Sequence, residues 1–392
     1  MQIDVGRAGK RVLIWLVALV LMPSLVEAQQ PGAAGVCGRP IALEDGWPIA
    51  TPESAGMDGA RLCGIADRLK AQDANVHAVV IARRGKLVFE QYFPGYDDPW
   101  GVPEGQFKFD ATTKHDMRSV SKSVASLLVG IAIDRKLIAS ADEPVLKYFS
   151  RYADVKSAGW EKISLRHLLT MSSGISWDEA RAWNDPKNDE PHLGRDADPL
   201  RYVLAKPIAA PPDTLWTYNG GGTDLLGNII TQVTGKPFDV FAREALFEPL
   251  GITDWEWKNY ENGKLAAAAG LRLRPRDAAK IGQLVLDRGA WNGRQIVSAV
   301  WIEQSIAPRF QATGYFGGLF FYGYQWWLGR SLSDAKEVSW IAGVGLGGQR
   351  LVIIPALEMV IMVTSGMYAS PRQGMATLDI LGSVVLPAVV GK

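Results

Sequence analysis

Residues 118–128 read RSVSKSVASLL, so a serine opens an apolar run and a lysine follows it three positions later. The run predicts a helix from Ser119 to about Ile133. The i, i+3 spacing places Ser119 and Lys122 on one face of this helix, whose N-terminus favours negative charge near Ser119. A serine hydroxyl becomes a nucleophile beside a base, and a lysine amine is such a base when burial or a second cation lowers its pKa. The stretch therefore suggests a Ser/Lys pair for nucleophilic catalysis.

A serine and a lysine at this spacing also occur by chance, and Ser121 and Ser123 crowd the same turn, so helix capping is the alternative. Two other segments support catalysis. Residues 215–227 read LWTYNGGGTDLLG and place Tyr218 just before glycines that open a helix. Residues 340–349 read WIAGVGLGGQ and put glycines inside a strand, where they are costly unless something approaches the backbone closely. A substrate lying along this strand would satisfy that condition.

Strand-like runs lie at both ends of the chain, with helices between them. A hairpin is expected over residues 77–92 with its turn at Arg84-Gly85. Further strands are expected over 322–328, 349–354 and 358–364, and helices over 58–69, 165–171, 223–233, 238–250, 278–286 and up to about Val390. We expect an α/β fold of the α+β type, in which N- and C-terminal strands form an antiparallel sheet with flanking helices. A mainly helical subdomain, about residues 140–290, is inserted, and its residues 183–195 form a polar, loop-like insert.

A series of motifs covers nearly the whole chain after the predicted signal peptide. In order, they are residues 47–58, the hairpin, Ser119-x-x-Lys122, residues 164–174, the Tyr218 segment and Gly343-Val-Gly345. In this order they resemble the class C β-lactamase-like serine hydrolase family, which includes penicillin-binding-type peptidases, esterases and 6-aminohexanoate-dimer hydrolases. The resemblance implies a β-lactamase/transpeptidase-like fold and a single domain over residues 52–392.

The resemblance also implies a role for each matching residue. Ser119 would be the nucleophile, Lys122 its general base or proton shuttle, and Tyr218 the acid/base that handles the leaving group. The backbone N–H groups of Ser119 and Leu346 would form the oxyanion hole. The expected reaction is cleavage of a small-molecule amide or ester through an acyl-enzyme, and no cofactor is implied.

Two departures from the family pattern narrow the substrate. The tyrosine motif usually reads Tyr-x-Asn, whereas this chain has Gly220 in the third position. The later motif usually begins with Lys or His, whereas here it begins with Gly343. A cation there would help to bind a substrate carboxylate, so its absence argues against β-lactams and acidic peptides. The chain is closer to the esterase and 6-aminohexanoate-dimer hydrolase branch.

Candidate substrate contacts come from the glycine strand and from an aromatic loop. They are Gly343, Gly345, Trp177 and Asp178, although Asp178 and Glu179 read mainly as a solvated loop. The tryptophans Trp326 and Trp327 read as core and hairpin packing, with only one of the two pointing inward because a strand alternates its faces.

Several other classes of site have little support. The formal net charge is +1, from 42 basic and 41 acidic residues, which does not favour a nucleic-acid partner. Residues 343–348 match Gly-x-Gly-x-x-Gly but precede a strand, unlike a nucleotide fingerprint. No metal-binding spacing is present. His77 and His167 read as structural residues, and His115 could line the entrance of the site.

The first residues read as an export signal. Two basic residues precede the apolar run 12–22, and residues 26–28 end in a small-x-small site. This pattern predicts a signal peptide over residues 1–28, cleaved after Ala28, and a periplasmic or secreted protein without a stable membrane span. An uncleaved anchor is the alternative, although the run is shorter than the ~20 residues that a spanning helix needs.

Residues 29–51 are expected to form a leader segment that contains the first of the two cysteines, Cys37 and Cys63. Export makes a disulfide between them plausible, and two unrelated buried thiols are the alternative.

Two further functions stay open on the sequence. One is a non-catalytic, penicillin-binding-like module that binds a component of the cell envelope. The other is a D-amino-acid peptidase or weak β-lactamase. Intact Ser119, Lys122 and Tyr218 favour an enzyme over the binding module.

Overall fold

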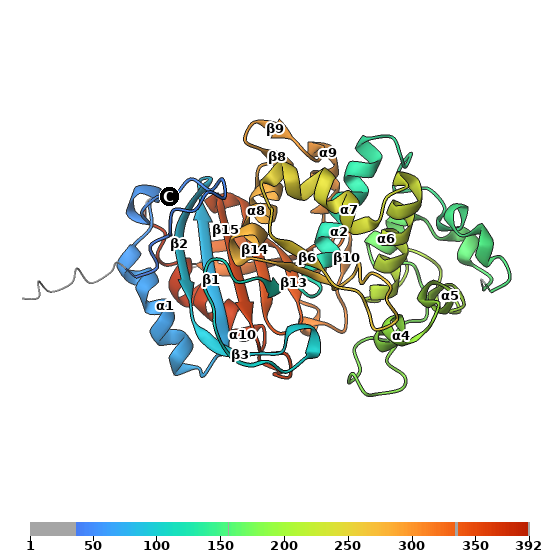
Figure 1. Ribbon diagram of the computed structural model, residues 1–392, viewed down its shortest axis with the longest axis horizontal. Helices are drawn as coiled ribbons and strands as arrows, with labels where there is room; N and C mark the ends of the chain where they lie inside the picture. The colour runs from blue at the N-terminus through green and yellow to red at the C-terminus, as the bar shows by residue number, and fades with distance from the viewer. Residues whose placement is uncertain (1–36, 156, 334–335, 391–392) are drawn as a thin grey trace, which may run out of the picture. The chain divides into compact units, whose positions relative to one another are not determined.

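The structure is a computed structural model that describes residues 37–155, 157–333 and 336–390 (Figure 1). The predicted signal peptide and residues 29–36 of the predicted leader lie outside the described residues. In the described part of the chain, no helix combines the length and the apolar character needed to cross a membrane.

The centre of the fold is an antiparallel sheet built from both ends of the chain, as predicted (Figure 1). Eight of its strands are described, in the spatial order β10 (Phe310–Gln311), β11 (Phe321–Tyr322), β12 (Trp327–Ser333), β13 (Lys336–Gly345), β14 (Gln349–Ile354), β15 (Met359–Ser365), β1 (Val76–Arg83) and β2 (Lys86–Tyr92). The predicted hairpin is the pair β1 and β2, and β15 pairs with β1 from residue 76 to residue 83.

Both faces of this sheet are covered by other parts of the chain. A sheet with one face in water would show alternating buried and exposed side chains along its strands. All eight residues of β1 are buried. Val79 and Ile81 belong to one core cluster, whereas Val80 and Ala82 belong to the other, as the two-residue period of a strand requires. The sheet therefore lies between two apolar cores.

Different helices cover the two faces. On one face lie α1 (Gly59–Ala71) and α10 (Met375–Ile380), which continues into a π-helical turn, Leu381–Val385. On the other face, α8 (Pro275–Leu286) packs on β14, β15 and β1, and α2 (Val120–Asp134) packs on β13 and β14. The sheet thereby holds the N-terminus of α2, where Ser119 lies.

The middle of the chain is mainly helical, as predicted. Its helices beyond α2 are α3 (Leu165–Leu169), α4 (Glu190–Arg195), α5 (Pro199–Leu204), α6 (Gly220–Thr234) and α7 (Phe238–Ala242), and α9 (Ala299–Ser305) follows α8. The expected helix 238–250 is one helical stretch, since α7 continues through a π-helical turn and a 3-10 turn to Leu250. Although α8 falls within the range expected for the inserted subdomain, it packs on the sheet.

Short strands pair outside the main sheet. They are β3 (Pro94–Asp97) with β4 (Gly105–Lys108), β5 (His115–Asp116) with β7 (Leu271–Leu273), β6 (Trp255–Trp257) with β7, and β8 (Ala290–Trp291) with β9 (Arg294–Gln295). The pair β5 and β7 ties the segment just before Ser119 to the segment that follows the helical region.

The expected strand 322–328 was wrong in one respect, because the chain leaves the sheet between β11 and β12. Gln325 has a φ of 64°, and its side chain accepts a hydrogen bond from Thr223 of α6 at 3.0 Å. Trp326 and Trp327 are 0% and 3% exposed and belong to different cores. Both tryptophans point inward, since both faces of the sheet are covered.

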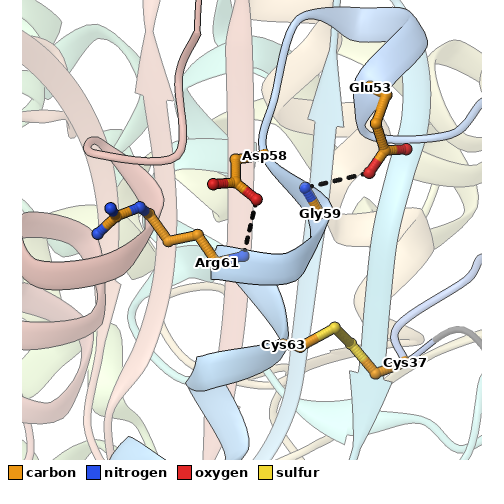
Figure 2. Close-up of a disulfide and its surroundings, with 6 residues drawn as sticks. All are labelled: Cys37, Glu53, Asp58, Gly59, Arg61 and Cys63. Atoms are coloured by element: carbon orange, nitrogen blue, oxygen red, sulfur yellow. Dashed lines mark hydrogen bonds between the residues drawn. A yellow bond between two sulfur atoms is a disulfide. The ribbon is translucent and has the colours of Figure 1, made fainter.

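The N-terminal part of the described chain is fastened to the sheet domain. Cys37 and Cys63 form a disulfide, which decides between the two readings of the cysteines (Figure 2). Asp45 pairs with the buried Arg276 of α8 at 2.8 Å. The described residues of the expected leader are therefore part of the folded domain.

Candidate active site

Ser119 is the N-cap residue of α2, and its side chain makes no capping hydrogen bond. Its hydroxyl is half-buried and lines two clefts. The preceding residue, Arg118, has a φ of 48°, an unfavourable conformation for a non-glycine residue that is concentrated at functional sites. The turn therefore leaves the Ser119 hydroxyl free for other partners.

The neighbouring serines have structural partners instead. Ser121 Oγ donates to Arg118 O at 2.6 Å and accepts from Leu271 N at 3.1 Å. Ser123 Oγ donates to Gln325 O at 2.7 Å. These bonds tie α2 to β7 and to the turn between β11 and β12. The alternative that Ser119, Ser121 and Ser123 all serve as helix caps is therefore wrong, since Ser119 makes no capping bond.

Lys122 lies one turn after Ser119 and is 1% exposed. Its Nζ donates to Ser119 Oγ at 3.0 Å and to Ala268 O at 3.3 Å. It also lies 4.9 Å from the centre of the Tyr218 ring. The structure therefore brings the three predicted catalytic side chains together.

Tyr218 is held just before α6, whose N-terminus is capped by Asn219 through its contact with Gly222 N at 2.9 Å. The Tyr218 side chain lies near that of Ser119, whose hydroxyl acts to lower the pKa of Tyr218. Its ring packs among aromatic side chains at the core cluster that contains Val79 and Ile81, namely Trp216, Tyr315, Tyr322 and Trp327.

Burial and the neighbouring charges determine the protonation states of Lys122 and Tyr218. Burial lowers the pKa of Lys122, but Tyr218, Glu179, Glu190 and Asp224 act in the opposite direction, and the net effect raises the pKa of Lys122 to about 12. Burial raises the pKa of Tyr218, and although the charge of Lys122 lowers it, the net effect is a raised pKa. Near neutral pH, Lys122 is therefore an ammonium group rather than the free amine that the sequence argument required of a base.

Glu179 is a site residue that the sequence reading placed in a solvated loop. Its Oε2 accepts from Gly220 N and from Trp177 Nε1, both at 2.7 Å. A Cβ built on Gly220 would lie 3.1 Å from the same oxygen. The Glu179 carboxylate thus lies beside the position where the family pattern has an asparagine side chain.

Two further carboxyl groups act on this centre. Burial raises the pKa of Glu179 to about 7, with a further increase from Glu190 and a decrease from Lys122. Burial also raises the pKa of Asp224 to about 7 and raises that of Glu190. The site therefore gathers carboxyl groups that titrate nearer to neutral pH than ordinary ones.

Two clefts meet at Ser119 and share Glu190 and Leu346. The first, called here the Trp183 cleft, has a volume of about 270 Å³ and is lined by Trp100, Arg118, Trp183, Arg195 and Tyr260. The second, the Trp327 cleft, has a volume of about 360 Å³ and is lined by Tyr218, Tyr315, Phe316, Trp327 and Arg350. An extended substrate can therefore lie across Ser119 with one part in each cleft.

The end of β13 forms one wall of the Trp327 cleft through Val344, Gly345 and Leu346. A Cβ on Gly345 would lie 2.4 Å from Met117 O, so this glycine is required by the chain just before Ser119. A Cβ on Gly343 would instead meet Val120 of α2 at 3.1 Å. Of the two glycines expected to bind substrate, Gly345 lines the Trp327 cleft, whereas Gly343 lines neither of the two clefts at Ser119.

Arg350 brings a cation to the Trp327 cleft from the neighbouring strand, β14. It is 7% exposed, and its Nη1 donates to Gly345 O and Gln349 O, both at 2.8 Å. Among the described residues, Arg350 forms no ion pair with a carboxylate. Burial lowers its pKa to about 10, so the guanidinium remains charged near neutral pH. The cleft therefore holds a cation even though Gly343 replaces the expected Lys or His.

The other predicted residues lie at varying depths. Trp177 is 6% exposed and supports Glu179 from behind, whereas the Asp178 side chain forms an ion pair with Arg181 at 2.5 Å. His115 is 0% exposed, so the suggestion that it lines the entrance was wrong. The loop-like insert contains α4, and its Trp183, Glu190 and Arg195 line the Trp183 cleft.

Known proteins similar to this chain indicate the family to which it belongs. The family model described as Beta-lactamase matches residues 64–382. The 6-aminohexanoate-dimer hydrolase of Paenarthrobacter ureafaciens is 25% identical over 336 residues, which is 80% of each chain. Esterase EstB of Burkholderia gladioli is 25% identical over 228 residues, 56% of each chain.

Among solved structures, a penicillin-binding protein homologue from Pyrococcus abyssi has a TM-score of 0.62 at 21% identity, covering 82% of this chain and 77% of that one. This likeness shows the β-lactamase/transpeptidase-like fold. The family match over most of the chain, together with its hydrolase relatives, shows that this chain belongs to the Beta-lactamase family and is a hydrolase.

Proposed function

We propose that this hydrolase cleaves an amide or ester of a small molecule through an acyl-enzyme on Ser119. The observation that carries the proposal is the contact of Lys122 Nζ with Ser119 Oγ at 3.0 Å, at the point where the two clefts meet. Tyr218, which lies beside Lys122 and is influenced by the Ser119 hydroxyl, supplies a second group that can exchange a proton with the nucleophile. Such a set of nucleophile, acid/base and charge is what acyl transfer requires.

In the reactive form, Tyr218 is a phenolate and Lys122 an ammonium; because the pKa of Tyr218 is raised, increasing pH populates this form. Ser119 Oγ attacks the substrate carbonyl carbon while its proton passes to Tyr218 Oη. The carbonyl oxygen becomes an oxyanion, which the N–H groups of Ser119 and Leu346 stabilise, a contribution typically of about 3 kcal/mol for each donor. Tyr218 then gives the proton to the leaving oxygen or nitrogen as its bond to carbon breaks.

The second half of the reaction uses the same groups in reverse. Tyr218 takes a proton from a water molecule, and the resulting hydroxide attacks the acyl carbon. The bond from carbon to Ser119 Oγ breaks, and Oγ takes the proton back from Tyr218. Throughout both halves Lys122 keeps its proton, and its positive charge stabilises the negative charge on Oγ and on the phenolate.

The lining of the Trp327 cleft indicates the kind of substrate. Tyr315, Phe316 and Trp327 offer an aromatic wall for an apolar chain, and Arg350 offers a cation for a carboxylate at its far end. The names of the relatives concern 6-aminohexanoate dimers and esters. We extend this to short, flexible amides and esters for the present chain.

We also infer that the protein acts outside the cytoplasm, in the periplasm or after secretion. The disulfide between Cys37 and Cys63 supports this inference, because disulfides persist in oxidising compartments. N-terminal sequencing of the exported protein tests it, since cleavage after Ala28 leaves Gln29 first. An intact Met1 would contradict it.

A hydrolysis panel tests the proposed reaction directly. Short-chain p-nitrophenyl esters, a 6-aminohexanoate dimer, a D-amino-acid peptide and a cephalosporin are offered to the wild type, to Ser119→Ala and to Ser126→Ala. Ser126 is a matched control, because it lies on the same helix and its hydroxyl has no hydrogen-bond partner. We expect Ser119→Ala to lose turnover by at least a thousandfold while Ser126→Ala keeps it; turnover by Ser119→Ala would refute the nucleophile.

A further inference from the structure

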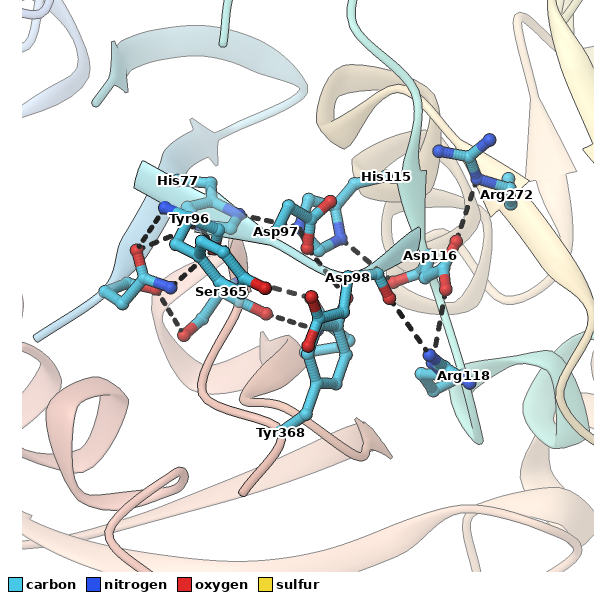
Figure 3. A network of polar contacts seen from close by, with 12 residues as sticks. His77, Tyr96, Asp97, Asp98, His115, Asp116, Arg118, Arg272, Ser365 and Tyr368 are labelled. Atoms are coloured by element: carbon cyan, nitrogen blue, oxygen red, sulfur yellow. Dashed lines mark hydrogen bonds and ion pairs between the residues drawn. The ribbon is translucent and has the colours of Figure 1, made fainter. Parts of the chain in front are cut away.

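His77, Asp97 and His115 converge in a second polar centre (Figure 3). None of the three lines either cleft at Ser119. They come from three elements, since His77 lies on β1, Asp97 ends β3 and His115 begins β5. They are 0%, 2% and 0% exposed. A buried group of this kind must have each of its polar atoms satisfied.

The surroundings of His77 fix its tautomer. Its Nε2 faces Tyr96 O at 3.1 Å and Asn75 Oδ1 at 3.2 Å. The amide of Asn75 is itself oriented, because its Nδ2 donates to Tyr96 O at 2.7 Å and its Oδ1 accepts from Tyr96 N at 3.2 Å. Both neighbours of Nε2 are therefore acceptors, so Nε2 carries the hydrogen and Nδ1 of the neutral ring has only a lone pair.

The same reasoning applies to His115. Its Nδ1 faces Asp116 O at 3.1 Å, so Nδ1 carries the hydrogen and Nε2 has the lone pair. The two bare nitrogens, His77 Nδ1 and His115 Nε2, lie 2.8 Å apart. Asp97 Oδ1 lies 3.7 Å from His115 Nε2. Three acceptors thus face one another, and such an arrangement requires a cation between them.

We propose that His77, Asp97 and His115 bind a divalent metal ion of the zinc class. Their ligand atoms all lie within 4.8 Å of one another, and two imidazoles with a carboxylate are ligands that Zn²⁺ accepts at about 2.0–2.2 Å. The second ring nitrogen of each histidine binds a carbonyl oxygen, as is usual for histidines that bind metals. Tyr368 donates to Asp97 Oδ1 at 3.1 Å and orients the carboxylate.

A single shared proton is the competing cation. It would lie between the two ring nitrogens, and it would leave the Asp97 oxygen outside hydrogen-bond range of His115 Nε2 at 3.7 Å. A metal ion bonds to all three atoms at once. Sequence spacing does not indicate this site, because His77 and His115 are 38 residues apart and only the fold brings them together.

The position of the site suggests what the metal ion does. His115 is followed by Asp116, which pairs with Arg118 at 3.2 Å and with Arg272 at 2.8 Å (Figure 3). Arg118 directly precedes Ser119. A metal ion on His115 therefore fixes the segment that orients the nucleophile, and its ligands are positioning residues that do not touch substrate.

The metal content of the full chain tests the proposal. The protein is purified without metal-affinity steps, dialysed against metal-free buffer and measured by inductively coupled plasma mass spectrometry. We expect close to one transition-metal ion per chain in the wild type, and a loss of at least tenfold in His115→Gln and Asp97→Asn. His167→Gln is the matched control, because His167 makes a helix-capping bond with Ser164, and it should keep the metal.

Two readouts keep the test decisive if the variants do not fold. Wild-type protein refolded with Co²⁺ should show the visible absorption of a histidine-ligated cobalt ion, and chelation should lower the unfolding temperature of the wild type. The proposal is overturned if the wild type holds less than a tenth of an equivalent of metal and fails to take up Co²⁺. It is equally overturned if both ligand variants fold and keep the metal.

Discussion

At the scale of single residues, Glu179 contributes to the pKa of Tyr218. Burial raises this pKa most, the charge of Lys122 lowers it, and the negative charge of Glu179 raises it further. If the phenolate of Tyr218 is the base, activity rises with pH as that hydroxyl loses its proton. The change Glu179→Gln removes a negative charge, so the pKa of Tyr218 falls. We predict that the alkaline rise of kcat/KM moves to lower pH in this variant.

A pH profile of ester hydrolysis measures the shift. Glu303→Gln is the matched control, because Glu303 is an exposed residue paired with Arg288 on the surface. This variant should keep the wild-type profile. A Glu179→Gln profile that moves to higher pH, or that coincides with the wild type, would contradict the role given to Tyr218.

The leaving group gives a second test of Tyr218. An amine leaves poorly unless it is protonated, whereas a p-nitrophenolate leaves without a proton. The change Tyr218→Phe should therefore reduce kcat for an amide more strongly than kcat for an activated ester with the same acyl group. The ratio of the two rates measures this, and equal losses on both substrates would argue against a proton transfer from Tyr218.

At the scale of elements, the end of β13 depends on a close approach to the segment before α2. A Cβ on Gly345 would lie 2.4 Å from Met117 O, and steric overpacking of this kind costs about 1–3 kcal/mol. We predict that Gly345→Ala lowers stability by that amount and also lowers kcat, because the strand must move away from Ser119.

Urea denaturation together with ester kinetics measures both effects. Gly64→Ala is the control, since Gly64 lies in α1 and a Cβ there would meet nothing within 4 Å. This control should be neutral or more stable by up to about 1 kcal/mol, because alanine favours a helix. Wild-type stability and turnover in Gly345→Ala would show that the close approach is not needed.

Elements with a clear hydrophobic period were predictable. The hairpin of β1 and β2, the helix that follows Ser119 and the strands β14 and β15 are all confirmed. The break between β11 and β12 was not predictable, because it depends on the contact of Gln325 with Thr223, which is distant in sequence. Local patterns do not report such tertiary contacts.

At the scale of the whole molecule, the site is assembled from segments that only the fold brings together. Ser119, Lys122 and Tyr218 could be predicted, since each lies in a short motif and the motifs occur in a known order. Glu179 and Arg350 could not be predicted as site residues. Glu179 is brought to the site by its contact with Gly220 N, and Arg350 by the pairing of β14 with β13. The sequence lacks the Asn and the Lys or His of the family pattern, at Gly220 and Gly343. This indicates where other polar side chains are needed, but it does not indicate which residues supply them.

The disulfide joins the N-terminal segment to α1 (Figure 2), and it closes a loop between two cysteines that are 26 positions apart. In the chain-entropy model, a loop of this length stabilises the fold by about 3 kcal/mol. We predict that the double variant Cys37→Ser, Cys63→Ser is less stable by this amount. It should keep its activity, because the bridge is attached to α1, which covers the face of the sheet opposite to α2. Chemical denaturation with and without reductant measures it, and an unchanged midpoint would contradict the prediction.

The covalent state of Ser119 tests the central claim most directly. The protein is mixed with a fluorophosphonate, and the labelled site is located by peptide mass spectrometry. The proposed mechanism predicts one label per chain on Ser119, full loss of label and of turnover in Ser119→Ala, and normal labelling of Ser126→Ala. Hydrolysis that persists in Ser119→Ala, or an active wild type labelled at another residue, would contradict it.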